Sequence, residues 1–282
     1  MNATNGKALA RRSIVIEPRR GPLALNFAEL WEARELLYFL AWREVRVRYK
    51  QTALGVAWIL IQPLVTMVIF SVIFGRLARL PSEGIPYPLF VLSGLIPWQM
   101  FAMSLTRTAG SLVANANLLT KIYFPRLLIP LSAAAAGLVD FVFSLLLLVV
   151  VLAYYGVHPG WQLLAMPFFV LLALLTAIAV GLWLSALNVR YRDVHIALPF
   201  LVQIWFFASP IAYSATLVPG GIWRLVYGLN PMAGVIDGFR WSLTGANPPG
   251  IQLLGSAALV LALLIGGLIY FRTAEKSFAD VV

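Results

Sequence analysis

The stretch NANLLTKIYFPRLLIP, Asn115 to Pro130, begins with two closely spaced asparagines, carries Lys121 and Arg126, and ends in a proline. Apolar runs flank it on both sides, at residues 88–114 and 127–155. Each run exceeds the roughly 20 residues that a helix needs to cross the hydrocarbon core of a bilayer. The stretch is therefore predicted to be a short, basic and partly apolar helix that joins two membrane spans.

The composition of the chain predicts a polytopic membrane protein. Among its 282 residues, 61% are hydrophobic and only 11% are charged, whereas a soluble domain carries about 25% charged residues. The hydrocarbon core tolerates few charges, which explains the deficit. We interpret the formal net charge of +10 as a cytoplasmic face that meets anionic lipid headgroups, so no nucleic-acid partner is expected.

Metal sites and a secretory signal are not expected in this chain. It has no cysteine, which excludes disulfides and thiolate metal sites. His158 and His195 fall in different predicted loops and do not have the spacing of metal ligands. Residues 1–22 contain two arginine pairs but lack the apolar core of a secretory signal. Residues 1–25 are therefore predicted to form a disordered cytoplasmic tail.

Six segments are predicted to span the membrane: residues 53–75, 88–114, 127–155, 161–189, 194–212 and 251–271. The second is the weakest, because Pro97, Gln99 and Arg107 interrupt it. An even number of spans puts both termini on one side, and 17 of the 21 Lys and Arg residues fall on that side. Since positive charge gathers on the cytoplasmic side, both termini are predicted to be cytoplasmic, including a short tail at 273–282.

Residues 26–50 are predicted to form an amphipathic helix in the membrane interface. Apolar residues recur there at near-helical spacing, while glutamates and arginines fill much of the other face. A plain membrane anchor is the alternative. The end of the helix gathers four cations, Arg43, Arg46, Arg48 and Lys50. Two interpretations of these cations remain open: they are signals that set the topology, or they receive a phosphate-bearing substrate.

The loop from Tyr213 to Gly250 is long and unusually apolar. Within it, residues 221–245 contain two short apolar segments joined at Asn230-Pro231, and neither is long enough to cross the membrane. We predict a re-entrant helix pair before the last span. Because irregular backbone at membrane depth is tolerated only beside protein or a water-filled cavity, the pair is a candidate for the mouth of a pathway.

Six ordered blocks carry a resemblance to a known family: RYKQTALGVAWILIQPL, NANLLTKIYFPRLLIPL, GLVDF, NVRYRDV, ASPIAY and LNPMAGVIDGFRWSLTG. Together they resemble the transmembrane subunit of ATP-binding-cassette polysaccharide exporters, the Wzm-type O-antigen permeases with their capsule and teichoic-acid relatives. The resemblance covers residues 30–271. It implies an all-α integral membrane protein with the ABC type-2 exporter fold, in which six transmembrane helices follow an interface helix. It also implies a homodimer that works with two copies of a separate ATPase.

The resemblance identifies residues 115–124 as the coupling helix that inserts into a cleft on the ATPase. An apolar docking face and its polar neighbours are expected at Asn117, Leu118, Leu119, Lys121, Ile122 and Tyr123, with a second, smaller contact at Arg190, Arg192 and Asp193. An ordinary basic turn is the alternative. The chain has no GxxxxGK[ST] phosphate loop, so ATP and Mg²⁺ are expected on the partner, with no cofactor and no catalytic residue here.

Asp140 is the one carboxylate that lies deep in a predicted span. Intramembrane acids are candidates for function, including proton transport. A single acid in such a sequence more often pairs with a polar group inside the helix bundle, and Arg107 is the candidate partner. We favour this structural role. The alternative keeps an ion-coupled secondary transporter open, although such proteins usually contain internal repeats, and we find no convincing repeat here.

Seven aromatic residues are candidates for stacking on sugar rings along a channel: Trp58, Trp98, Phe101, Trp205, Phe206, Phe207 and Tyr213. For any one of them, a position facing lipid is the alternative. The sequence as a whole predicts one half of a channel-forming exporter in the inner membrane. Its expected cargo is a polyprenyl-pyrophosphate-linked polysaccharide, foremost an O-antigen. A drug or lipid exporter of the same superfamily is the nearest alternative.

Overall fold

The computed structural model describes residues 31–50, 57–121, 124–250, 252–275 and 278. The helices in this part of the chain are α2 (Arg34–Lys50), α3 (Ala57–Phe70), α4 (Tyr87–Ala114), α5 (Ala116–Lys121), α6 (Leu128–Tyr154), α7 (Met166–Arg190), α8 (Asp193–Phe207), α9 (Ile222–Gly228), α10 (Pro231–Thr244) and α11 (Gln252–Glu275). A π-helix, η1 (Ser71–Leu77), continues α3, and two 3₁₀ turns are η2 (Trp161–Ala165) and η3 (Ala215–Leu217). The predicted tail at 1–25 and the start of the predicted interface helix lie outside the described residues.

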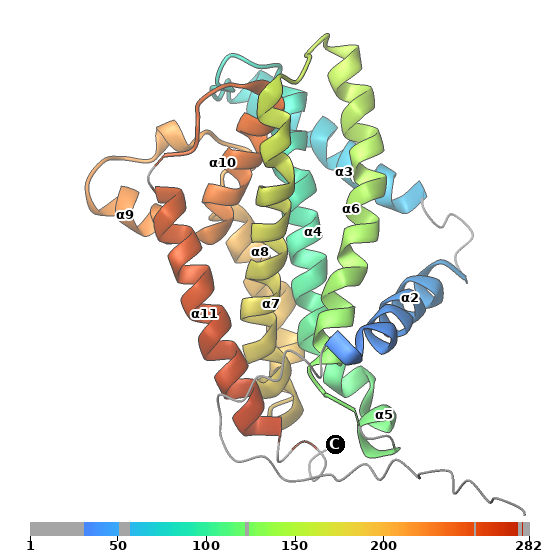
Figure 1. Ribbon diagram of the computed structural model, residues 1–282. Helices are drawn as coiled ribbons and strands as arrows, with labels where there is room; N and C mark the ends of the chain where they lie inside the picture. Colours follow the sequence, from blue (N-terminus) through green and yellow to red (C-terminus); the bar gives the residue numbers. More distant parts are fainter. Residues whose placement is uncertain (1–30, 51–56, 122–123, 251, 276–277, 279–282) are drawn as a thin grey trace, which may run out of the picture.

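Helix α4 forms the centre of the bundle and packs mainly against α6 and α7 (Figure 1). Small residues let the three backbones approach closely, as is usual between membrane helices. A Cβ atom added at Gly137 on α6 would lie 2.1 Å from Ser104 Oγ on α4. The Ser104 hydroxyl in turn donates to the carbonyl oxygen of Ala134 at 3.0 Å. The α4–α6 contact is therefore fixed by a steric fit and by a hydrogen bond.

Five of the six predicted spans appear as helical segments of spanning length: Ala57–Leu77, Tyr87–Ala114, Leu128–Tyr154, Trp161–Arg190 and Gln252–Glu275. The prediction for 194–212 was too long. Helix α8 ends at Phe207, and its 15 residues rise about 22 Å, which is short of a hydrocarbon core about 30 Å thick. Pro210 accounts for this end, because a proline disfavours helical geometry in the residue before it. The count of six spans stays a prediction.

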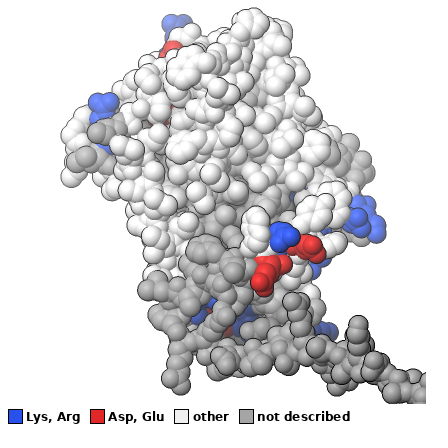
Figure 2. All heavy atoms as spheres, in the orientation of Figure 1, with Lys and Arg blue, Asp and Glu red and all other residues white. Residues whose placement is uncertain are grey.

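Helices α2 and α5 lie at the end of the bundle where α4 ends and α6 begins (Figure 1). Helix α2 packs along α6 and buries only Leu40 and Val45, as expected of a helix with one side open to its surroundings. The charged side chains of this region contrast with the middle of the visible face, where the described residues show no coloured atoms (Figure 2). An uncharged middle is typical of a surface that faces hydrocarbon.

Helices α9 and α10 are the two short helices that the sequence predicts at 221–245. Asn230 caps α10, because its side-chain oxygen accepts from the backbone N–H of Met232 at 3.0 Å. Gly245 ends α10 with a φ of 70°, in the left-handed region that favours glycine. Re-entry of the pair into the membrane remains a prediction. Helix α11 continues to Glu275, three residues into the segment predicted as a cytoplasmic tail, and the side on which this segment lies stays a prediction.

Candidate functional site

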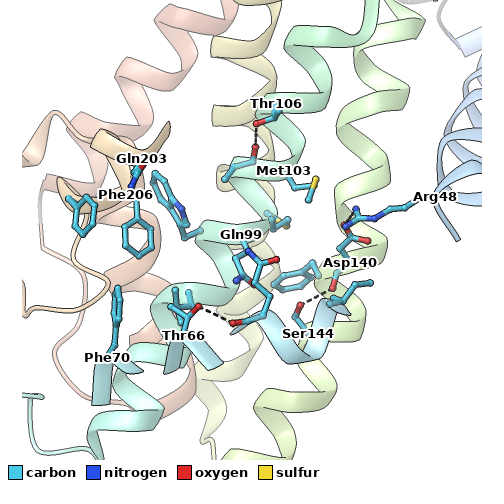
Figure 3. A pocket seen from close by; sticks show the side chains of 18 residues that line it. Arg48, Thr66, Phe70, Gln99, Met103, Thr106, Asp140, Ser144, Gln203 and Phe206 are labelled. Atoms are coloured by element: carbon cyan, nitrogen blue, oxygen red, sulfur yellow. Dashed lines mark hydrogen bonds and ion pairs between the residues drawn. The ribbon is translucent and has the colours of Figure 1, made fainter. Parts of the chain in front are cut away.

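A cavity of about 470 Å³ lies beside α4, between α3, α6 and α8 (Figure 3). The end of α2 reaches it through Arg48. Residues from five helices line it: Arg48, Ile59, Gln62, Thr66, Phe70, Leu95, Trp98, Gln99, Met100, Ala102, Met103, Thr106, Asp140, Phe141, Ser144, Gln203, Phe206 and Phe207. No other feature of the described residues joins so many of the sequence candidates.

Besides Arg48 and Asp140, three side-chain amides from three helices contribute polar groups to the cavity. Gln62 belongs to α3, Gln99 to α4 and Gln203 to α8, and each lines the cavity. Thr66 and Thr106 also line it, but their hydroxyls donate to the carbonyl oxygens one turn earlier in their own helices, at 2.9 and 2.8 Å. An amide both donates and accepts hydrogen bonds, so the three glutamines suit a ligand rich in hydroxyl groups.

Three of the seven predicted aromatic residues line this cavity: Trp98, Phe206 and Phe207. Trp98 is only 4% exposed and meets Phe206 edge to face, with ring centroids 5.7 Å apart, so its ring belongs mainly to the core. Phe207 is 61% exposed. The prediction for Phe101 was wrong. Its side chain is fully buried and packs edge to face on Trp205 at 4.8 Å, so it belongs to the core.

The remaining aromatic candidates lie elsewhere. Trp58 is 57% exposed and does not contribute to the cavity lining. Trp205 and Tyr213 line a second cavity, of about 720 Å³, between the end of α8, the loop that follows it, and α9. The lining of this second cavity is almost entirely apolar. The seven aromatics therefore do not form one continuous surface within a single chain.

Asp140 lies on α6 at the wall of the first cavity, where it binds groups from two other helices. Arg48 of α2 donates to one carboxylate oxygen, and the Tyr49 hydroxyl donates to the other. Arg107 of α4 has its Nη2 atom 4.0 Å from the oxygen that Arg48 binds. Figure 3 shows Arg48 reaching across from α2 to this carboxylate. These ion pairs favour a structural role for Asp140 over that of a proton carrier.

The environment of Tyr49 keeps its hydroxyl protonated. Burial, followed by the hydrogen bond to Asp140, raises the pKa of Tyr49 to about 12. Tyr49 therefore remains a donor to Asp140 at any physiological pH. The tyrosine and Arg48 are adjacent on α2, so together they attach the end of this helix to the middle of α6.

The other three of the four cations predicted at the end of the interface helix differ from Arg48 in their surroundings. Arg43 donates to the side-chain oxygen of Asn115 and pairs with Glu44 at 3.1 Å. Arg46 lies over the ring of Trp42, with its guanidinium carbon 5.8 Å from the ring centroid. Lys50 is exposed. The four cations therefore do not form one cluster, and Arg48 is the one that lines the cavity.

The predicted coupling helix is present as α5, but part of its predicted docking face was wrong. Leu119 is only 5% exposed and belongs to a buried cluster with Leu112, Leu127 and Phe271. Leu118 is half-buried, and Asn117 and Lys121 are exposed. Ile122 and Tyr123 lie outside the described residues. Arg190, Arg192 and Asp193 are exposed where α7 gives way to α8.

Arg240 is a buried cation that the sequence analysis missed, because it assigned this residue to a loop. Its side chain is 2% exposed. Nη2 donates to the carbonyl oxygen of Pro210 at 2.9 Å, and Nη1 pairs with Asp237 at 3.3 Å. The guanidinium also stacks on Phe90 of α4, 3.7 Å from the ring centroid. Arg240 thereby ties α10 to α4 and to the segment that follows α8.

Comparison with known proteins places these features in a family. The model of the ABC-2 type transporter family matches residues 35–244. An "O-antigen export system permease protein RfbA" of Myxococcus xanthus is 31% identical over 257 residues, 90% of this chain and 98% of the relative. A protein of the same name from Klebsiella pneumoniae is 30% identical over 88% of this chain and 95% of the relative. The "Polysialic acid transport protein KpsM" of Escherichia coli is 28% identical over 83% and 92%. The chain belongs to the ABC-2 type transporter family of multi-pass membrane transport permeases.

Proposed function

We propose that this chain is the permease subunit of an exporter that moves lipid-linked polysaccharide, foremost an O-antigen, across the inner membrane. Relatives with O-antigen export in their names match nearly the whole chain, and a relative named for polysialic acid transport matches most of it. ATP and Mg²⁺ bind to a separate ATPase subunit in this proposal. The permease itself carries out no covalent chemistry.

The observation that carries the proposal is the composition of the first cavity. The amides of Gln62, Gln99 and Gln203 supply donors and acceptors for sugar hydroxyls, and the rings of Phe206 and Phe207 supply apolar faces. Each of these contacts binds a single sugar unit weakly, so the next sugar of the polymer can replace it at the same place. A cavity with these side chains suits a polymer that must slide.

The exposed helices support a pairing with a second copy of the chain. Helix α3 bounds the cavity, yet only 11% of the most apolar stretch of Ala57–Leu77 is buried within one chain. Helix α8 buries only Leu198. Two copies that meet through these helices would close the cavity into a channel. Two ATPase subunits would then contact α5 and the α7–α8 junction on the cytoplasmic side, where both termini lie in this proposal.

A genetic experiment tests the function. Deletion of the gene should remove the surface polysaccharide and leave lipid-linked polymer inside the cell, and the wild-type gene should restore export. Gln99→Leu, in the cavity, should restore export poorly, whereas Gln252→Leu, on α11 and outside the cavity lining, should restore it fully. Normal surface polysaccharide after deletion would contradict the proposal and would favour a drug or lipid exporter.

A further inference from the structure

The ion cluster around Asp140 carries more positive than negative charge. Arg48 and Arg107 both face the carboxylate of Asp140. The one other acid near Arg107 is Glu44, and Glu44 is itself paired with Arg43 at 3.1 Å. Three arginines therefore meet two carboxylates, and one positive charge has no acidic partner in this part of the described chain.

The three charged groups Arg48, Asp140 and Arg107 differ in their access to the cavity. Arg48 and Asp140 line it, and the side chain of Arg48 is 31% exposed. Arg107 is 18% exposed and does not belong to the lining. A ligand in the cavity can therefore contact the Arg48 guanidinium, whereas Arg107 does not face the cavity.

We propose that Arg48 is an anion-binding residue of the cavity, and that Asp140 is an internal counter-ion which the phosphate group of a lipid-linked substrate displaces. This inference rests on the proposed function and assigns one of its substrate contacts. The guanidinium presents several N–H donors in a plane, a geometry that matches phosphate oxygens. The unbalanced positive charge of the cluster favours an anion at this place.

The exchange is feasible because Asp140 keeps partners when Arg48 leaves it. A buried carboxylate without a partner is costly, and this would normally oppose such an exchange. Here the Tyr49 hydroxyl still donates to the carboxylate, and Arg107 lies within 4.0 Å. Asp140 therefore has enough partners to release one of them to a ligand.

Binding of radiolabelled farnesyl diphosphate to the purified full-length chain tests the inference, with farnesol and phosphatidylglycerol as competitors. Arg48→Gln should weaken binding by about tenfold, the scale of one charge-assisted hydrogen bond. Asp140→Asn should strengthen binding, because the competing carboxylate is gone. Arg46→Gln is the matched control, since Arg46 lies on the same helix and stacks on Trp42 instead of lining the cavity.

The outcomes separate the sources of the phosphate and the two proposals. Equal losses in Arg48→Gln and Arg46→Gln would overturn the inference in favour of a diffuse positive surface. Competition by phosphatidylglycerol as strong as that by unlabelled farnesyl diphosphate would overturn the assignment to an isoprenoid substrate. If Asp140→Asn fails to fold, the double variant Arg48→Gln/Asp140→Asn replaces it and should bind as weakly as Arg48→Gln; tighter binding would refute the role of Arg48. Normal export by Arg48→Gln would refute the inference and leave the proposed function standing.

Discussion

Arg43 on α2 donates to the side-chain oxygen of Asn115, the residue that ends α4 and directly precedes α5. Helix α2 is thus bonded both to the start of the predicted coupling helix and, through Arg48, to the wall of the cavity. Arg43 and Arg48, five residues apart on α2, therefore connect the start of α5 with the wall of the cavity.

A double-mutant cycle measures the bond between Arg43 and Asn115. Arg43→Ala and Asn115→Ala should each lower the free energy of unfolding, and the two effects should be coupled by about 1 kcal/mol because the residues share one hydrogen bond. Thermal unfolding of the purified chain gives the values. Arg46→Ala combined with Asn115→Ala is the control, and additivity in both cycles would argue against the bond.

Leu119 and its neighbours on α5 should respond to substitution in opposite ways. Leu119→Ala should destabilise the chain by about 2–3 kcal/mol, because it empties a buried position. Leu118→Ala with Lys121→Glu should cost less stability than Leu119→Ala and should reduce co-purification of the ATPase, since Lys121 is exposed and Leu118 is only half-buried. Loss of the ATPase in Leu119→Ala at unchanged stability would show that the docking face includes Leu119 after all.

Removal of the buried guanidinium of Arg240 should be severe. Arg240→Ala leaves Asp237 without its cation and Pro210 without its donor, which should cost about 3–5 kcal/mol. Arg240→Lys should recover only part, because an ammonium cannot stack on Phe90 or donate in a plane. The melting temperature is the readout. Arg224→Ala, on the exposed side of α9, should melt like the wild type, and so would Arg240→Ala if the contacts carry no stability.

Helix α10 approaches α7 closely at Gly238, where an added Cβ would lie 1.9 Å from Cε1 of Phe169. Gly238→Ala should therefore destabilise the chain by about 1–3 kcal/mol. Adding Phe169→Leu should restore part of the loss, because it removes the clashing ring atoms. At Gly255 of α11 nothing lies within 4 Å of an added Cβ, so Gly255→Ala should be neutral or slightly stabilising. Equal behaviour of the two alanine variants would refute the close contact.

The contribution of Tyr49 should not depend on pH in the physiological range. Its pKa is raised from 10.0 to about 12 in the folded protein, so its stabilising effect is fully present below 10.0 and is lost only as pH rises toward 12. Tyr49→Phe should cost about 1 kcal/mol for the lost hydrogen bond. The difference in melting temperature from the wild type should stay constant between about pH 6 and about pH 9; a change within that window would contradict this assignment.

The bundle was predictable because spanning length and low charge are properties of local sequence. The second predicted span, 88–114, differs by one residue from α4 even though Pro97 lies inside it, since a proline within a long apolar run is tolerated when neighbouring helices pack around it. The end of α8 had a signal as well. Pro210 follows a short apolar run and is where the predicted span should have stopped.

The site was less predictable, because its contacts join residues far apart in the chain. The pairing of Arg48 with Asp140 spans 92 positions, and no local pattern shows that the end of α2 lies against α6. The burial of Arg240 depends on α10 packing against α4, which hydropathy does not reveal. The sequence also did not show which side of α5 is buried. A helix of six residues is too short for its periodicity to identify the inner face.

ATP-driven translocation of a polyprenyl-linked glycan is the decisive test of the proposed export function. The chain and its ATPase would be reconstituted together in vesicles, with the glycan supplied on the side of α2 and α5 and its arrival on the other side measured. The expected result is transport that requires ATP and both proteins and that continues when ion gradients are abolished. Transport by the chain alone, driven by an ion gradient and lost in Asp140→Asn, would contradict it.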